Sequence, residues 1–388
     1  MGLLAMPGRF LTTLIFAAAL AGCSELRLQR GVHEKSGDWT MYGGSIGRTN
    51  VSDAVVTPPL APVWEFDASA GFSPYSVALA DSYVFVGNLQ GEVRVIGAAG
   101  GKGLGSFDFG SAIVGTPVVD GSTMFVALAH DDQSLVSYDL ISGTVNWQIP
   151  AGDIETSPLR IGNRLYVTTL HGKLLCVDKG SGQILWKYQI PPRVRTRLIH
   201  SSPASDGTLV VFGSDNGDLY AVDAGDGTFR WSVHVGSCID GSPSVSGGRA
   251  FIGALDGNYS AVDLNTGHIA WSRMLDGPVF SSQAVTERSV YVGTAGRTVY
   301  CLNSGTGEIT WTATVGNVVN SSPLVTGEVV YTGCIDKTLY AFSAGTGEVL
   351  WKSALEGRIK TMPVASGDRL YVLAEDRSVI AMEHVSAP

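Results

Sequence analysis

A unit of about 40 residues recurs through most of this chain, and it constrains the fold more than any other feature. Its start is marked by Pro74, Pro117, Pro158, Pro203, Pro243, Gln283, Pro323 and Pro363. These positions are separated by 43, 41, 45, 40, 40, 40 and 40 residues, and seven of the eight preceding residues are Ser or Thr. A fixed period of this length is typical of solenoids and propellers, in which neighbouring repeats bury each other's faces.

Each repeat contains several short strand-like runs. Residues 329–333 and 339–343 are two such runs, and a Gly-containing turn and a run with Trp follow them. Glycine in a tight hairpin adopts positive φ without a steric penalty. Six glycines lie four residues before a Trp, namely Gly143, Gly182, Gly227, Gly267, Gly307 and Gly347. The pattern predicts an all-β fold, an eight-bladed β-propeller of four-stranded antiparallel blades over 58–388.

The two ends of the repeat region are complementary. The last repeat, from Pro363, lacks a Trp strand, whereas Trp64 precedes the first repeat and has no unit of its own. We therefore expect the strand around Trp64 to complete the C-terminal blade and close the ring. The first repeat departs from the pattern, because Gly105 stands where the spacing places Trp, with Phe107 as a candidate substitute.

The first residues have the layout of a secretory signal. Arg9 precedes an apolar run over 10–20, which is too short for a mature membrane span. The string 20–23, Leu-Ala-Gly-Cys, resembles the lipobox of bacterial lipoproteins. That resemblance implies removal of 1–22, lipidation of Cys23 and anchoring in the outer membrane, facing the periplasm. We expect 23–57 to be a lipidated N-terminus, tether and lead-in.

Composition excludes some classes of function. The net charge is −9 and the cations form no stripe, which argues against nucleic-acid binding. Cys176 and Cys301 occupy a place that other repeats fill with Ala, so we expect them to be buried and predict no disulfide with the remaining Cys238 and Cys334. No Cys or His spacing indicates a metal site.

The run 221–231, Ala-Val-Asp, three residues, Gly, three residues and Trp, resembles the tryptophan-docking motif of quinoprotein-type propellers. This superfamily includes PQQ-dependent dehydrogenases and BamB, a lipoprotein subunit of the machinery that assembles outer-membrane β-barrels. The lipobox and the compact blades resemble BamB more closely. The segment 39–50, with Trp39, Tyr42 and Arg48, is more similar to the lead-in of other quinoprotein-like propellers.

One connection is longer than the others. The step from Trp to the next repeat is 17 residues at 186→203 but 12 in the last four units. The resemblance to BamB implies that this loop contacts the BamA subunit. Candidate contact residues are Arg193, Val194, Arg195, Arg197 and Leu198, with Asp240 as the only acid of the next, shorter connection.

The positions three before each repeat start form a ring near one end of the predicted channel. They are Gly71, Val114, Glu155, His200, Asp240, Phe280, Asn320 and Lys360. The polar members, Glu155, His200, Asp240, Asn320 and Lys360, are candidates for a ligand site, and the alternative is a solvated rim. No cofactor is expected on the BamB-like interpretation. PQQ with Ca²⁺ belongs to the dehydrogenase alternative.

These observations favour a non-enzymatic scaffold that binds a BamA-like subunit and unfolded outer-membrane protein clients. A PQQ-dependent dehydrogenase and a generic periplasmic binding propeller are the alternatives.

Overall fold

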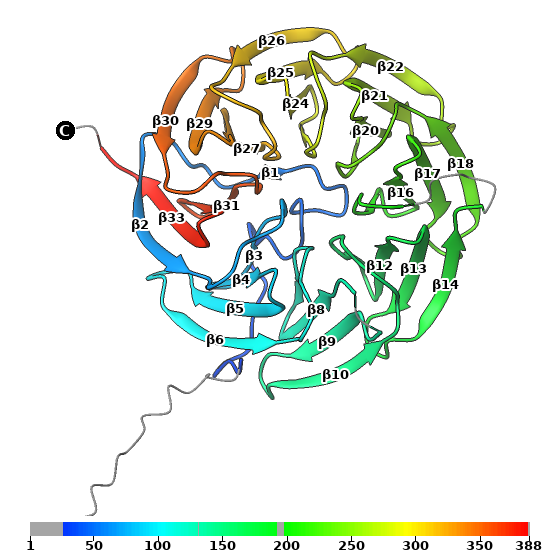
Figure 1. Ribbon diagram of the computed structural model, residues 1–388, viewed down its shortest axis with the longest axis vertical. Helices are drawn as coiled ribbons and strands as arrows, with labels where there is room; N and C mark the ends of the chain where they lie inside the picture. Colours follow the sequence, from blue (N-terminus) through cyan, green and yellow to red (C-terminus); the bar gives the residue numbers. More distant parts are fainter. Residues whose placement is uncertain (1–25, 131, 192–197, 387–388) are drawn as a thin grey trace, which may run out of the picture.

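A computed structural model describes residues 26–130, 132–191 and 198–386. Eight sheets are arranged around a central axis like the blades of a propeller (Figure 1). Each is a four-stranded antiparallel meander, and one receives a fifth, parallel strand near the axis. The predicted eight-bladed all-β architecture is confirmed.

The strands of the first four blades, from the axis outward, are as follows. Blade 1 comprises β3 (Ala78–Ala80), β4 (Tyr83–Gly87), β5 (Glu92–Gly97) and β6 (Gly103–Asp108); blade 2 comprises β7 (Val118–Asp120), β8 (Thr123–Ala127), β9 (Leu135–Asp139) and β10 (Thr144–Ile149). Blade 3 comprises β11 (Leu159–Ile161), β12 (Arg164–Thr169), β13 (Lys173–Asp178) and β14 (Ile184–Gln189); blade 4 comprises β15 (Ala204–Ser205), β16 (Leu209–Gly213), β17 (Asp218–Asp223) and β18 (Phe229–His234).

The other four blades follow the same order. Blade 5 comprises β19 (Ser244–Ser246), β20 (Arg249–Gly253), β21 (Asn258–Asp263) and β22 (Ile269–Met274); blade 6 comprises β23 (Ala284–Val285), β24 (Ser289–Gly293), β25 (Thr298–Asn303) and β26 (Ile309–Thr314). Blade 7 comprises β27 (Leu324–Thr326), β28 (Val329–Gly333), β29 (Thr338–Ser343) and β30 (Val349–Ala354), with β1 (Val51–Ser52) beside β27; blade 8 comprises β31 (Val364–Ser366), β32 (Arg369–Leu373), β33 (Ser378–His384) and β2 (Leu60–Asp67).

The ring closes as the sequence predicts. Strand β2 pairs antiparallel with β33, and Trp64 lies opposite Ala381. The two ends of the repeat region therefore share one sheet, so the N-terminal strand holds blade 8 against blade 1 (Figure 1).

At six of the eight blade junctions a repeated tryptophan packs the outer strand onto the following blade. The indole Nε1 of Trp271 donates to the carbonyl of Ser304 at 3.0 Å, and Trp311 makes the equivalent bond to Ala344 at 2.9 Å. The glycine of the next hairpin lies under each ring. Blades are thus joined by a buried aromatic ring and one directed hydrogen bond.

The start of the first repeat differs from its sequence assignment. Strand β3 begins at Ala78, and the amide of Ser76 bonds Thr116 as the amide of Thr116 bonds Ser157. The counterpart of Pro117 is therefore Val77, and the assignment to Pro74 is wrong by three residues. A proline in the connection between β2 and β3 imitated the repeat signal.

Residues 26–57, expected to form a tether and lead-in, are packed against the propeller. Leu26, Leu28 and Val32 are buried at the outer edge, and Trp39 and Arg48 are buried farther along. Removal of apolar surface from water drives such packing. The irregular sequence of this segment carries no periodic signal that predicted it.

The four cysteines of the described chain are free, and Cys176 and Cys301 are buried opposite Trp186 and Trp311. Within the described residues, no helix is long and apolar enough to cross a membrane.

Candidate binding pocket at the channel mouth

A chain of hydrogen bonds runs around the channel from blade 1 to blade 7 at the start of the repeats. In six successive blades a backbone amide donates to the Ser or Thr hydroxyl of the next blade, over 2.7–3.1 Å. The donors are Ser76, Thr116, Ser157, Ser202, Ser242 and Ser282. The hydroxyl before the proline is therefore a structural element of the ring, which explains why the repeat carries it.

The lead-in segment 40–52 closes the channel from inside. Its carbonyls accept hydrogen bonds from the innermost strands of five blades. The donor amides are those of Val119, Ser205, Val245, Val285 and Val325, and the acceptors are Thr40, Ile46, Gly47, Thr49 and Asn50. The channel is therefore a pocket with a floor, not an open pore.

Arg48 is the central residue of this floor, and its side chain is fully buried. It donates to the carbonyls of Tyr42 at 2.7 Å and Ser157 at 2.8 Å, and also to those of Pro203 and Pro158. Burial lowers the pKa of Arg48 to about 10, so the guanidinium remains charged at neutral pH. All of its hydrogen-bond acceptors are backbone carbonyls, so it ties blades 3 and 4 to the lead-in.

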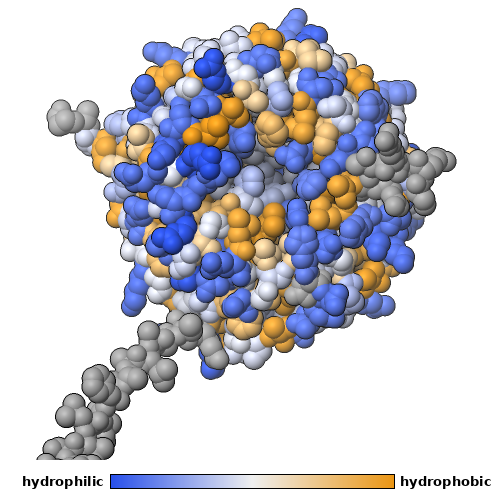
Figure 2. Space-filling model, viewed as in Figure 1, coloured by the Kyte–Doolittle hydropathy of each residue, from blue (hydrophilic) through white to orange (hydrophobic). Residues whose placement is uncertain are grey.

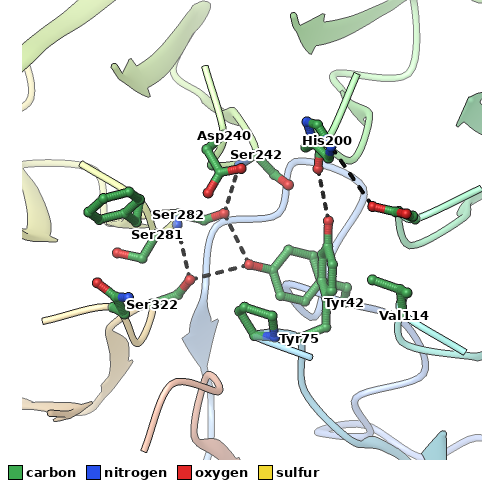
Figure 3. Close-up of a pocket in the computed structure, with 14 residues that line it drawn as sticks. Tyr42, Tyr75, Val114, His200, Asp240, Ser242, Ser281, Ser282 and Ser322 are labelled. Carbon is green, nitrogen blue, oxygen red and sulfur yellow. Dashed lines mark hydrogen bonds and ion pairs between the residues drawn. The ribbon is translucent and has the colours of Figure 1, made fainter. Parts of the chain in front are cut away.

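Two tyrosines form the base of the pocket (Figure 3). Tyr42 lies edge-on to Tyr75, with ring centroids 4.9 Å apart, and its hydroxyl donates to Ser282 at 3.0 Å. The hydroxyl of Tyr75 donates to the carbonyl of His200 at 3.1 Å, and burial raises the pKa of Tyr75. Both hydroxyls are therefore held in fixed positions, and the Tyr75 phenol stays neutral.

The pocket encloses about 170 Å³ above these rings. It is lined by Tyr42, Pro74, Tyr75, Val114, Glu155, His200, Asp240, Gly241, Ser242, Phe280, Ser281, Ser282, Asn320 and Ser322. The face in Figure 2 is hollowed at its centre, with polar and apolar residues interspersed around it. Small-molecule sites usually enclose ~300 Å³ or more, so this pocket suits only a small ligand or water.

Acidic groups surround the single histidine of the lining. His200 Nδ1 lies 3.0 Å from Asp215, and its Nε2 lies 3.8 Å from Glu155. The hydrogen bond with Asp215 raises the pKa of His200. Partial desolvation in the pocket wall raises the pKa of Asp240, although that residue keeps an exposed face. The mouth is therefore an acidic rim whose charge changes with the protonation of His200.

The structure places six members of the predicted ring in the lining, the polar Glu155, His200, Asp240 and Asn320 together with Val114 and Phe280. Lys360 does not line the pocket and instead forms an ion pair with Glu375 at 2.5 Å. Pro74 takes the place expected of Gly71, because the first repeat starts three residues later than predicted. Sequence reasoning did not identify Tyr75 or Ser281 as lining residues, because both lie two residues before a repeat start and only the position three before was considered.

The predicted partner loop is described only at its edges. Arg193, Val194, Arg195 and Arg197 lie outside the described residues, as does the lipidation candidate Cys23. Leu198 is exposed, although its carbonyl accepts the amide of Asp215 at 3.0 Å. Asp240 is also exposed at the mouth. The loop thus leaves blade 3 and re-enters at the rim of the pocket.

The chemistry of the lining does not match a quinone cofactor. PQQ carries three carboxylates, whereas the charged groups of the pocket are Glu155, Asp240 and His200. The nearest buried cation, Arg48, has its donors committed to backbone carbonyls. Ca²⁺ needs six to eight oxygen ligands, and no group of three or more His, Cys, Asp or Glu within the described ranges is placed to hold a metal ion.

A family model described as outer membrane protein assembly factor BamB matches four overlapping segments of the chain, 56–199, 192–283, 273–344 and 329–387. Together they cover all eight blades.

Two curated proteins match shorter parts. BamB of Alkalilimnicola ehrlichii is 27% identical over 128 residues, which are 30% of this chain and 31% of the relative. The dehydrogenase subunit of a quinone alcohol dehydrogenase of Gluconobacter oxydans is 31% identical over 87 residues, 21% of this chain and 12% of the relative. The chain thus matches less than a third of either relative's length.

Among solved structures, BamB from Moraxella catarrhalis superposes with a TM-score of 0.71 at 21% identity. The match covers 84% of this chain and all of that one. At this identity the likeness concerns the fold alone.

Proposed function

The chain belongs to the family described as outer membrane protein assembly factor BamB, and from that premise we propose that it is a non-enzymatic scaffold in the assembly of outer-membrane β-barrel proteins. The observation that carries the proposal is the family match over every blade. The acidic, small and already hydrogen-bonded pocket supports it, because such a pocket offers little for catalysis.

In this role the protein is anchored by lipid on Cys23 at the periplasmic face of the outer membrane. It binds a BamA-like subunit through the loop 190–200. Ile190 and Ile199 are buried at its two ends, so they fix the base of the loop while the residues between carry the contact. Three arginines among apolar residues suit an interface, where arginine is enriched.

Asp240 extends this contact surface. It is exposed on the connection before blade 5, and its neighbours His200 and Asp215 belong to blade 4. Leu198 adds an exposed apolar side chain beside them. A partner would therefore meet a positive loop next to an acidic mouth, a pattern that favours oriented association.

The test is co-purification in mild detergent from the native host. We expect a BamA-like subunit to be recovered with the protein, and deletion of the gene to lower the outer-membrane content of β-barrel proteins. Absence of both effects would overturn the proposal.

Charge reversal locates the contact. Arg193, Arg195 and Arg197 are changed together to Glu, and a control variant changes the exposed Lys102, Arg288 and Lys352 to Glu. The net charge changes equally, so only the loop variant should lose the subunit while both remain folded. Equal retention in the two variants would favour a generic binding propeller.

The dehydrogenase alternative is favoured by one observation, the Gluconobacter match. Titration of the purified protein with PQQ and Ca²⁺, followed by dye reduction with primary alcohols, tests it. Dye reduction dependent on both additions would replace the scaffold proposal.

A further inference from the structure

The described chain begins with a segment that is fixed to the edge of the propeller. Leu26, Leu28 and Val32 are buried, and the carbonyl of Leu26 accepts the hydroxyl of Tyr138 at 2.7 Å. In Figure 1 this dark-blue segment lies at the outer edge between β6 and β10. It therefore belongs to the packed body of the protein.

This segment fills the place of a missing tryptophan. At six of the other seven blade junctions an indole N–H bonds a hairpin carbonyl, as Trp231 bonds Leu264, and the ring covers a glycine. Blade 1 has Gly105 at that position, and the equivalent carbonyl of Leu140 accepts the amide of Leu28 at 2.6 Å.

The glycine of the same hairpin has the matching contact. A Cβ on Gly143 would meet the carbonyl of Leu26 at 3.4 Å and the side chain of Arg27 at 3.5 Å, where other hairpin glycines meet a Trp ring. The start of the chain thus occupies a docking site of the fold.

Ion pairs hold the next residues. Arg30 lies 3.0 Å from the buried carboxylate of Asp81, and Lys35 pairs with the same group. The amide of Val32 donates to Ser122 at 3.2 Å. A buried carboxylate is costly to leave unpaired, so these contacts resist detachment of the segment.

The segment and the channel mouth lie on opposite faces. It contacts Ser122 in the β7–β8 turn and Ile141 in the β9–β10 turn. The pocket is lined by the connections that lead from each outer strand to the next blade. In an antiparallel meander these connections and those turns lie at opposite ends of the strands.

We propose that the packed segment 26–32, which we call the N-terminal clamp, orients the propeller on the membrane. The edge of blades 1 and 2 that carries the β7–β8 and β9–β10 turns lies against the lipid surface, and the channel mouth is directed away from it. This inference rests on the lipidation of Cys23 in the proposed function. Only three residue steps separate Cys23 from the clamped Leu26, a span of at most ~11 Å. The membrane must therefore lie close to this edge.

The orientation leaves the pocket and the loop 190–200 accessible to a partner. The net charge of −9 would not draw the protein onto an anionic bilayer by itself, so tether geometry decides which edge approaches. This edge of the propeller therefore contacts a lipid surface.

The test places a fluorophore at three exposed positions in the lipidated, full-length mature protein on vesicles that contain nitroxide headgroup lipid. Ser142→Cys lies in the turn beside the clamp, Thr306→Cys occupies the matching turn of blade 6, and Gln90→Cys lies at the mouth end of blade 1. Each is made with Cys238→Ser, since the other described cysteines are buried. We expect strong quenching at 142 and little at 306 or 90.

A matched variant carries a Gly-Ser spacer of about 20 residues between Ser24 and Glu25, with a root-mean-square length of roughly 25 Å. It should lose the preference for position 142 and keep the same fold. Equal quenching at all three positions without the spacer would overturn the orientation.

Mass spectrometry of the same preparation separates the two proposals. If Cys23 carries no lipid, the proposed anchoring fails. The orientation is then measured with a hexahistidine tag placed directly before Ser24, which attaches the protein to nickel-chelating vesicles. The clamp again predicts the strongest quenching at position 142, and equal quenching at the three positions would reject it.

Discussion

The indole Nε1 of Trp231 donates a hydrogen bond of 2.8 Å to the carbonyl of Leu264 in the next blade. The ring lies directly over Gly267, whose φ is +72°. One aromatic side chain thus requires two features of the next blade, a carbonyl to accept its N–H and a glycine beneath its ring.

Gly267→Ala should therefore destabilise the protein by more than its backbone conformation alone explains. A Cβ at 267 would lie 2.7 Å from the ring of Trp231, an overpacking that typically costs ~1–3 kcal/mol. Gly247→Ala is the control, because Gly247 also has positive φ but nothing lies within 4 Å of its Cβ position. Urea unfolding measures both, and equal losses would contradict the docking argument.

Removal of Trp64 should open the ring at its closure. The indole of Trp64 bonds Ala98 of blade 1 at 2.9 Å while its strand completes blade 8. Trp64→Ala should cost ~3–5 kcal/mol and speed amide exchange of β33. Trp147→Ala is the comparison, since Trp147 is only half-buried and joins blade 2 to blade 3, and it should leave β33 protected. Hydrogen exchange with mass spectrometry distinguishes the two.

Arg48→Met should be strongly destabilising although it removes a charge from the interior. The substitution leaves the carbonyls of Tyr42, Ser157 and Pro203 without their donor, and each hydrogen bond to a charged group contributes ~1.5–3 kcal/mol. Arg48→Lys keeps the charge but has no planar fork to reach separate carbonyls, so it should fall between wild type and Met. Thermal unfolding ranks the three, and a Met variant as stable as wild type would refute the role.

The contact of His200 with Asp215 should stabilise the fold more in mild acid than in mild base. The pKa of His200 is raised above its usual 6.5 in the folded protein. Its contribution is therefore complete below the unfolded pKa and lost as pH rises through the folded value. Asp215→Asn should cost less than about 1 kcal/mol, because the imidazole is partly exposed, and the loss should shrink above the folded pKa. Urea unfolding at pH 5.5 and 8.5, with an NMR titration of His200, checks the sign.

The repeat predicted the blades because its signals are local. A Gly four residues before a Trp specifies a hairpin and a docking ring together, and 40-residue spacing specifies how the units stack. The pairing of Trp64 with blade 8 was also predictable, because one strand was missing at one end and unassigned at the other.

The pocket was predictable only in part. Glu155, His200, Asp240 and Asn320 share one repeat position, so the period brought them to one rim. Lys360 shares that position too, but Glu375 draws its ammonium into an ion pair. A side chain's partner depends on neighbours that no period encodes.

The sequence by itself determined the ring, its blade number and its closure, since these follow from short-range turns and a strict period. Only the tertiary structure decided the fate of residues 26–57. Leu28 occupies the docking site that Gly105 leaves open, and Arg48 lies at the channel floor. The reason is physical: an irregular segment finds its place by filling gaps and satisfying buried carbonyls, and those exist only once the blades have assembled.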